Sequence, residues 1–320
     1  MSLWSATLPA VALALSTPAH AGSGPWVLGV ADHTLYMGLE AQRFDHLAQS
    51  SGSGADDVIQ VSDGVQTFGA KAIATVGLLP RLEGELAVPW SVVRNNRPDD
   101  SPCDVLGLDA CDETRGVGVL RARAKGLLLD EIVGSPVSLA LGGELRLGQL
   151  TSPTRARVTN LGEGTLDAGG FLSVGRIGSL GKGYWSGYVE AGGRYRSRNR
   201  SYDQVQAPGA EVWVDGELLF APRRSVAVGP TATWLHRPEG VDVEDLLADP
   251  ALGGDVDRFA ALRIQAAQAG VKALVRTGEQ VTTSLGVLHT VYAVNNPTDV
   301  WTVDLGVSFR GFLDRRDDRG

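Results

Sequence analysis

The chain has 320 residues, and its 37 Asp and Glu outnumber its 29 Lys and Arg, which gives a formal net charge of −8. This acidic balance disfavours nucleic acid as a partner, because phosphate-binding proteins normally carry a basic stripe. No interior run approaches the roughly 18 apolar residues of a membrane-spanning helix, so a bundle of such helices is excluded. The strands of a membrane β-barrel are half polar and remain compatible with this composition.

The N-terminus has the pattern of an exported protein. An apolar core from Leu8 to Leu15 is followed by Pro18 and by Ala19-His20-Ala21, the small-x-small pattern of a signal-peptidase site. The sequence therefore predicts a signal peptide over residues 1–21, cleaved after Ala21, and export to an oxidising compartment. No Lys or Arg precedes the apolar core, unlike the usual signal, and a buried N-terminal helix is the alternative.

Alternation of apolar and polar residues begins at residues 33–44, where every second side chain from Leu35 to Leu39 is apolar. Period 2 is the signature of a strand with one apolar and one polar face. A hairpin follows over residues 64–94, with its turn at residues 77–81. Its arms of about 11–13 residues exceed the roughly 5–6 of a soluble strand and match the roughly 9–11 of a strand that crosses a bilayer. The hairpin therefore predicts a transmembrane β-barrel.

Nine further segments alternate in the same way and complete a predicted set of twelve strands. They lie within residues 116–129, 137–149, 164–178, 184–198, 210–221, 226–236, 259–275, 280–292 and 301–312. The connections after even-numbered strands are short, and those after odd-numbered strands are mostly long. This is the layout of bacterial outer-membrane barrels, with short periplasmic turns, long extracellular loops and both termini in the periplasm. A soluble β-sandwich is the alternative, but nothing in that fold requires the alternation of loop lengths.

The predicted fold is therefore all-β, a transmembrane antiparallel up-and-down β-barrel of about twelve strands. We expect the barrel to occupy residues 22–312, followed by a C-terminal periplasmic tail over residues 313–320. The last strand ends in Phe309 or Phe312, which resembles the signal by which barrels are recognised for insertion. The expected location is the cell outer membrane of a Gram-negative bacterium.

Several motifs occur in the order found in one known family. The turn Gly77-Leu78-Leu79-Pro80-Arg81-Leu82-Glu83, with Pro89 at the strand end, is followed by GVGVLRARAKGLLL, GELRLGQ, GEGTLDAGGFLSVGR and VEAGGRYR. On these motifs residues 30–312 resemble outer-membrane transporters of the phenol meta-pathway type, whose turn reads Gly-Leu-Thr-Asp-Arg-Leu-Glu. The chain departs from that pattern at Leu79-Pro80 and at Val119, where the family often has Asp. The resemblance implies a channel for small, often hydrophobic or aromatic, solutes.

In a barrel the polar parity of each strand points into the lumen, while the apolar parity faces lipid. The candidates predicted to line the lumen and contact solute are Glu83, Glu85, Arg121, Arg123, Lys125, Glu144, Arg146, Glu190, Arg194, Arg196, Asp215, Glu217, Asp304 and Arg310. Such charges would discriminate solutes by charge and size. The alternative is that they pair across a narrow lumen, because buried charges seldom remain unpaired. The two interpretations are compatible.

Cys103 and Cys111 are the only cysteines and are predicted to form a disulfide within one extracellular loop. No His lies near them to complete a soft metal site, so no metal is predicted, and no cofactor is expected. Acidic residues of this loop and of the loop over residues 237–257 predict a solvated acidic rim. Weak binding of divalent cations is the alternative, although EF-hand spacing is absent.

An enzymatic barrel is the main competing class, since outer-membrane phospholipases also have twelve strands and use a Ser-His-Asn site. Neither His236 nor His289 lies in a recognisable motif, and no G-x-S-x-G elbow is present. Ser284 is on the same predicted strand as His289 but has the opposite parity, so the two side chains face opposite ways. We therefore expect that the protein is not an enzyme.

The sequence as a whole predicts a monomeric outer-membrane channel or transporter. It would allow passive passage or binding of small solutes, hydrophobic or aromatic ones included, through a narrow lumen of mixed charge. The expected partners are membrane lipid, lipopolysaccharide, the solute and the barrel-assembly machinery. A structural or adhesive barrel with a closed lumen is one alternative, and a barrel hydrolase is another.

Overall fold

The computed structural model describes residues 24–48, 58–95, 113–148, 165–197, 209–223, 225–240, 263–278 and 280–311. Four predicted features lie outside these ranges: the signal peptide, the Cys103–Cys111 disulfide, most acidic residues of the two long loops, and the tail at residues 313–320. Within them, none of the helical segments has the length and apolar character needed to cross a membrane.

Strands make up nearly all of the described chain, and their order follows the sequence. Their bounds are β1 His33–Ala48, β2 Val58–Leu79, β3 Leu82–Asn95, β4 Glu113–Val117, β5 Leu120–Leu129, β6 Ser138–Leu147, β7 Leu166–Leu180, β8 Gly183–Arg196, β9 Glu211–Arg223, β10 Val226–Arg237, β11 Ile264–Arg276, β12 Val281–Val294, β13 Asn296–Pro297 and β14 Trp301–Gly311. One short 3-10 helix, η2, spans Glu131–Val133.

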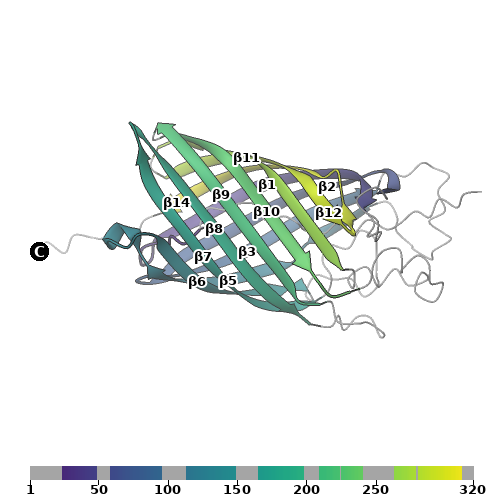
Figure 1. The fold of residues 1–320 in the computed structure, drawn as a ribbon, viewed down its shortest axis with the longest axis horizontal. Helices are drawn as coiled ribbons and strands as arrows, with labels where there is room; N and C mark the ends of the chain where they lie inside the picture. The colour runs from purple at the N-terminus through teal and green to yellow at the C-terminus, as the bar shows by residue number, and fades with distance from the viewer. Residues whose placement is uncertain are drawn as a thin grey trace, which may run out of the picture.

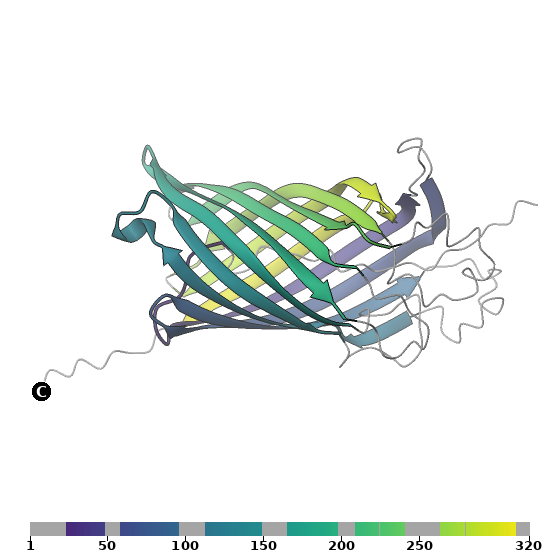
Figure 2. The same cartoon turned by 60° about the horizontal axis from the view of Figure 1, so that its bottom comes forward.

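The strands form one closed antiparallel barrel (Figures 1 and 2). Sequence neighbours pair with each other, and β1 pairs with both β2 and β14, which closes the sheet. The two-residue β13 pairs with the end of β1. Both β4 and β5 pair with β3, so together they occupy one strand position in the barrel. The described wall therefore has twelve strand positions around the barrel. The predicted fold and strand count are confirmed.

The segment predicted as a continuous strand over residues 116–129 is interrupted at Gly118 and Val119. The interruption lies opposite Pro89 of β3, whose carbonyl oxygen accepts a hydrogen bond of 2.9 Å from the Gly118 amide. A proline has no N–H group to donate to a neighbouring strand, so the regular ladder cannot continue past it. The prediction is corrected here, because β4 and β5 are separate elements.

The two faces of the wall differ as the alternation predicts. On the outer face of β1, Leu35, Met37 and Leu39 are exposed, whereas Tyr36 on the inner face is buried. The same alternation recurs on the other long strands, with exposed Val, Leu and Ile outside and polar or charged side chains inside. An apolar outer face and a polar inner face are typical of strands that cross a bilayer around a lumen.

One prediction tests this assignment of the outer face. Leu39 lies in the middle of β1 and is 62% exposed, so Leu39→Arg should weaken folding into lipid vesicles by about 2–4 kcal/mol. Leu180 is similarly exposed but ends β7 beside a short turn, so Leu180→Arg should cost only about 0–1 kcal/mol. Denaturant titration in vesicles measures both values. Equal costs would contradict the assignment.

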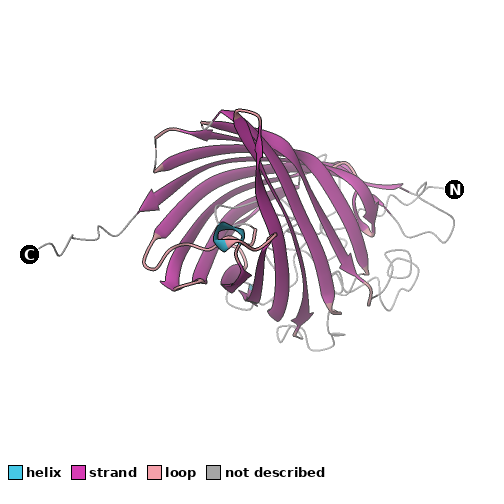
Figure 3. Cartoon of the chain, turned by 60° about the vertical axis from the view of Figure 1, so that its left-hand side comes forward, coloured by secondary structure: helices cyan, strands magenta, loops and turns pink. Residues whose placement is uncertain are grey.

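The connections differ at the two ends of the barrel. At one end, which we call the short-turn rim, β2–β3, β7–β8 and β9–β10 are joined by two residues each, and η2 lies in the β5–β6 connection. His33 of β1 pairs with Gly311 of β14 at the same rim, so the described wall begins and ends there. The other end, the long-loop rim, is where the longer connections begin. Figure 3 shows the tilted strands and η2 at the short-turn rim.

Candidate functional site

The inner face of the barrel is the candidate site, and thirteen of the fourteen predicted lumen residues are buried or half-buried on it. Most of their ion-pair partners lie on the same or a neighbouring strand, but some lie farther round the wall, as in the pair between Arg123 of β5 and Glu190 of β8. Contacts of this kind form only across the concave side of the wall. Arg310 differs, because it lies one residue before the end of β14 at the short-turn rim. Its side chain is 45% exposed and contacts Asp32 at 3.4 Å.

The charged side chains are aligned by the strand register. Glu85, Arg123 and Glu144 are direct cross-strand neighbours on β3, β5 and β6. The same row continues through Gly169 to Arg194 and Glu211 on β7, β8 and β9. Charges of opposite sign therefore alternate along the row, which favours cross-strand pairing. We refer to this set of residues as the charged row.

Four arginines gather around three carboxylates near the long-loop rim. This arginine cluster consists of Arg146, Arg194, Arg196 and Arg237 with Glu144, Asp167 and Glu211. Glu144 accepts from Arg146 at 2.8 Å and from Arg194 at 3.3 Å. Glu211 pairs with Arg194, lies 3.6 Å from Arg196 and accepts from Arg237 at 3.3 Å. Among the described residues, four arginines therefore share these three carboxylates.

The opposite part of the wall is acidic. Lys71 Nζ lies 2.6 Å from Asp304 and 3.4 Å from Glu40, so one lysine serves two carboxylates. The Tyr36 hydroxyl donates to Asp304 at 2.8 Å. In the next part of this wall, Lys272 pairs with Glu217 at 2.8 Å, and Thr233 donates to Asp215 at 2.6 Å. In this part of the described wall, Glu40, Asp215, Glu217 and Asp304 therefore lie near two lysines, Lys71 and Lys272.

An apolar row runs beside the charged row on the inner face. Phe171, Trp213, Leu235 and Ala266 are cross-strand neighbours on β7, β9, β10 and β11, with Gly192 of β8 between the first two, and form one buried cluster. The Arg123 guanidinium lies 3.9 Å from the centroid of the Phe171 ring, and that of Arg194 lies 5.2 Å from the Trp213 ring. These are cation–π stacks that join the two rows.

Glycine makes room for both rings of the apolar row. A Cβ at Gly142 would collide with the Phe171 ring, and a Cβ at Gly192 would collide with the Trp213 ring. The two rings therefore lie flat over neighbouring backbone and do not project far into the lumen. This row was not predicted from the sequence, because Phe171 and Trp213 lie at the inward-facing positions of their strands but are not polar.

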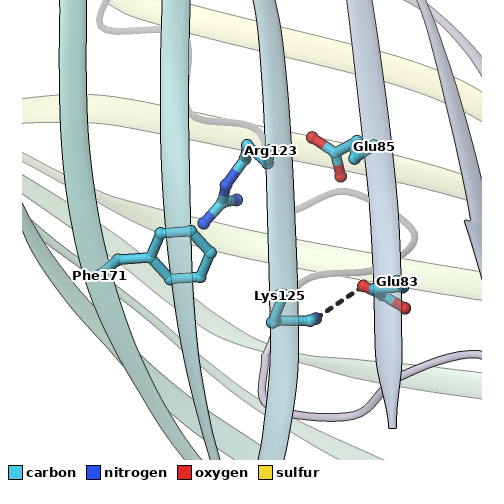
Figure 4. A pocket seen from close by; sticks show the side chains of 5 residues that line it. All are labelled: Glu83, Glu85, Arg123, Lys125 and Phe171. Atoms are coloured by element: carbon cyan, nitrogen blue, oxygen red, sulfur yellow. Dashed lines mark ion pairs between the residues drawn. The ribbon is translucent and has the colours of Figure 1, made fainter. Parts of the chain in front are cut away.

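A pocket opens beside the Arg123–Phe171 stack (Figure 4). Glu83, Glu85, Arg123, Lys125 and Phe171 line a small hollow of about 10 Å³, which has room for a single water molecule and is partly open to solvent. Lys125 faces Glu83 across it at 2.9 Å. Four of these five residues are among the predicted lumen candidates. The structure therefore brings candidates from β3 and β5 together around free space as well as in ion pairs.

The segment that precedes β1 crosses the barrel at the short-turn rim. We call residues 24–32 the N-terminal segment. Its Gly24 carbonyl oxygen accepts from Lys125 Nζ at 2.7 Å, and its Leu28 amide donates to Glu83 at 2.9 Å. The Trp26 indole donates to Glu131 of η2 at 3.1 Å and packs edge-on against Tyr188 of β8. The segment thus reaches from β1 past β3 and β5 to β8.

Sequence reasoning missed several charged residues of the site. Glu40, Lys71, Asp167, Glu211, Arg237 and Lys272 are paired on the inner face but were not among the candidates. All lie at the polar parity of their strands, so applying the same criterion to every strand would have found them. The position of the N-terminal segment has no comparable signal, because its residues do not alternate.

The two histidines weighed as candidates for an enzyme lie on the outer side of the wall. His236 stacks on Trp234 with ring centroids 5.6 Å apart, and His289 packs on Trp301 at 4.4 Å. Both histidines are on the outer parity of their strands, whereas Ser284 is buried on the inner parity. Across the part of the chain that the structure describes, no three His, Cys, Asp or Glu side chains are grouped so as to hold a metal ion.

A closed, twelve-stranded antiparallel barrel that is apolar outside and charged inside is typical of outer-membrane β-barrels, and this fold places the chain in that class. No protein-family model matches the chain, and no curated protein matches its sequence.

Among solved structures, an outer membrane channel from Pseudomonas putida has the same fold, with a TM-score of 0.64 at 14% identity over 91% of this chain and 99% of that one. The NanC porin matches with a TM-score of 0.46 at 7% identity, over 85% of this chain and 98% of its own. LpxR from Salmonella typhimurium gives 0.44 at 9% identity, over 86% and 99%. The resemblance to the phenol meta-pathway type transporters stays a prediction.

Proposed function

We propose that the protein is a non-enzymatic outer-membrane channel that admits small solutes through a narrow lumen of mixed charge. The observation that carries the proposal is the inner wall, where rows of ion pairs leave a pocket beside Arg123 and Phe171. A barrel that served only as a support could fill its interior with side chains and leave no hollow, as small barrels do. Charged rows in a lumen select solutes by charge and size.

The proposal places the barrel in the outer membrane, with its apolar outer face against lipid and the short-turn rim in the periplasm. The predicted signal peptide and the apolar outer parity both support this location. The fold shared with a bacterial outer membrane channel is consistent with it. A structural or adhesive barrel is the competing function, and it differs in that its lumen would carry no flow.

Conductance in planar bilayers tests the channel directly. Arg121 Nη2 lies 2.9 Å from Glu85 Oε1 on the inner wall, so removing either side chain leaves the other charge in the lumen. Arg121→Ala should shift ion selectivity towards cations, and Glu85→Ala should shift it towards anions. The double variant should return close to the original selectivity. Reversal potentials in a salt gradient measure all three.

A control and a contrary outcome sharpen this test. Arg176 is exposed on the outer parity of β7, so Arg176→Ala removes a charge without altering the lumen. It should leave the reversal potential unchanged. A barrel that migrates as a folded species and never conducts would overturn the channel proposal and favour a structural role.

A further inference from the structure

The outer face of the barrel carries arginines near the long-loop rim, and they lie on one side only. Arg43 of β1, Arg94 of β3 and Arg115 of β4 are exposed at outward-facing positions in the half of the wall nearer this rim. No other outward-facing position of the described strands in this half holds a lysine or an arginine. Farther round the same rim the wall presents exposed aromatic rings, as at Tyr195 of β8 and Trp301 of β14. Such rings are the usual residues at a membrane interface, so the arginines mark a distinct sector.

The strand register places these arginines close together. Arg43 faces Gln66 of β2, and Gln66 faces Arg94 of β3. Arg115 faces Val92, which lies two residues before Arg94 on the same side of β3. Because neighbouring strands are about 4.8 Å apart, Arg43 and Arg115 are separated by about 14 Å across the wall. Two long, flexible side chains at this spacing can converge on one headgroup.

Arg43 and Arg115 differ from the arginines of the inner face in their partners. Neither takes part in an ion pair or a side-chain hydrogen bond with another described residue, whereas Arg121 on the inner face pairs with Glu85. The chain as a whole has a net charge of −8, so this basic sector does not follow from its overall composition. A guanidinium offers five N–H donors in a geometry that suits phosphate, and here those donors face the lipid interface.

Towards the middle of the wall, the same sector has an apolar surface of uneven height. Ala70, Ala72 and Ala74 are successive outward residues of β2, and we call them the alanine strip. Each alanine faces a larger side chain on both neighbouring strands. These larger side chains are all exposed and are Leu35, Met37 and Leu39 on β1 and Leu86, Val88 and Trp90 on β3. The wall is therefore lower along β2 than along β1 and β3, which suits an acyl chain lying parallel to the strand.

We propose that this sector is the docking face for one lipopolysaccharide molecule, an inference that goes beyond the channel function and rests on the proposed outer-membrane location. The phosphates of the glycolipid headgroup accept hydrogen bonds from Arg43 and Arg115, and one acyl chain lies along the alanine strip. Charge complementarity at the rim selects an anionic lipid. Two cations on one headgroup favour a lipid with two phosphates, because a single phosphate leaves one arginine without an acceptor.

Native mass spectrometry of the mature barrel, folded in detergent, tests the docking face without requiring flow. The probe is lipid A with two phosphates, compared with monophosphoryl lipid A and with phosphatidylglycerol. The bisphosphorylated lipid should bind as a single copy, at least about tenfold more tightly than either of the others. Its affinity should fall as salt is added, because these arginines are exposed. Equal affinities for the three lipids would overturn the proposal.

Paired substitutions at exposed positions locate the contact. Arg43→Gln combined with Arg115→Gln should weaken lipid A binding by at least about tenfold, because charge-assisted hydrogen bonds are lost. Arg176→Gln combined with Lys182→Gln is the matched control, since it removes two exposed positive charges nearer the short-turn rim. This control should leave the affinity unchanged. An equal loss in both double variants would reduce the effect to net charge and overturn the docking face.

The alanine strip is tested by filling it. Ala72→Phe should weaken lipid A binding several-fold, because the new ring occupies the place of the acyl chain. Ala191→Phe adds the same ring to the outer face of β8 and should have no effect. The same spectra report the mass of the assembly. A dimer that Ala72→Phe converts to a monomer would assign this face to a second copy of the chain and overturn the lipid.

The two proposals fail in different experiments. A barrel that conducts, and that binds lipid A no more tightly than phosphatidylglycerol, keeps its channel function and loses the docking face. A barrel that binds lipid A selectively through Arg43 and Arg115 and never conducts in planar bilayers retains the docking face and loses the channel function. Circular dichroism on each variant verifies that the β-barrel is folded before either result is read.

Discussion

Deleting residues 24–28 should raise single-channel conductance several-fold. These residues cross the lumen at the short-turn rim and are anchored there by Lys125, Glu83 and Glu131. Conductance falls as the narrowest cross-section of a pore narrows, so removing the crossing chain opens that end. The wall should persist, because Lys125 and Glu83 still pair with each other at 2.9 Å. The deletion begins after Ser23, which leaves the predicted cleavage site intact.

A same-length replacement serves as the control for this deletion. Changing residues 24–28 to a Gly-Ser repeat keeps the chain length but removes the Trp26 contacts with Glu131 and Tyr188. It should give noisy, frequently interrupted currents, because an unanchored segment moves in and out of the lumen. Unchanged conductance in both variants would contradict the idea that the N-terminal segment limits flow.

Replacing Glu211 should have the largest effect on stability. This side chain is 2% exposed and contacts Arg194, Arg196 and Arg237. Glu211→Gln leaves the four arginines of the cluster with Glu144 and Asp167, and breaking such a buried pair from one side costs about 3–5 kcal/mol. Urea unfolding of the barrel in lipid vesicles measures this loss.

Two comparisons show whether the effect is electrostatic. Glu211→Gln combined with Arg237→Gln should recover part of the lost free energy, because one cation is removed together with one anion. Asp32→Asn breaks an exposed pair with Arg310 and should cost less than about 1 kcal/mol. If Glu211→Gln cost no more than Asp32→Asn, the arginine cluster would contribute little to the fold.

The strands could be predicted because the alternation that identifies each strand lies within its own residues. Alternation at Leu35 to Leu39 fixes the faces of β1 without reference to any other residue, and short turns fix which strands are neighbours. The same alternation places Glu83, Arg123 and Glu190 on the inner face. The exception, the break at Gly118, arises from Pro89 on the neighbouring strand and so depends on register.

The partners of those side chains could not be read from the sequence. Arg123 pairs with Glu190, which lies three strands further round the barrel. Which residue becomes the partner depends on the tilt of the strands and the diameter of the barrel. Phe171 and Trp213 were hidden because sequence reasoning followed polarity, whereas these rings fill space above Gly142 and Gly192. The N-terminal segment has no periodicity, so only three-dimensional contacts reveal where it lies.

The seam between β1 and β14 has a consequence for how the molecule can be made. His33 pairs with Gly311, so the first and last strands of the wall meet only after almost the whole chain has been synthesised. Until the 11 residues of β14 arrive, β1 and β12 each present an open row of backbone N–H and C=O groups. Such edges are not tolerated in hydrocarbon. A chain truncated before Trp301 therefore leaves both of these edges unpaired, so the wall can close only once the last strand is in place.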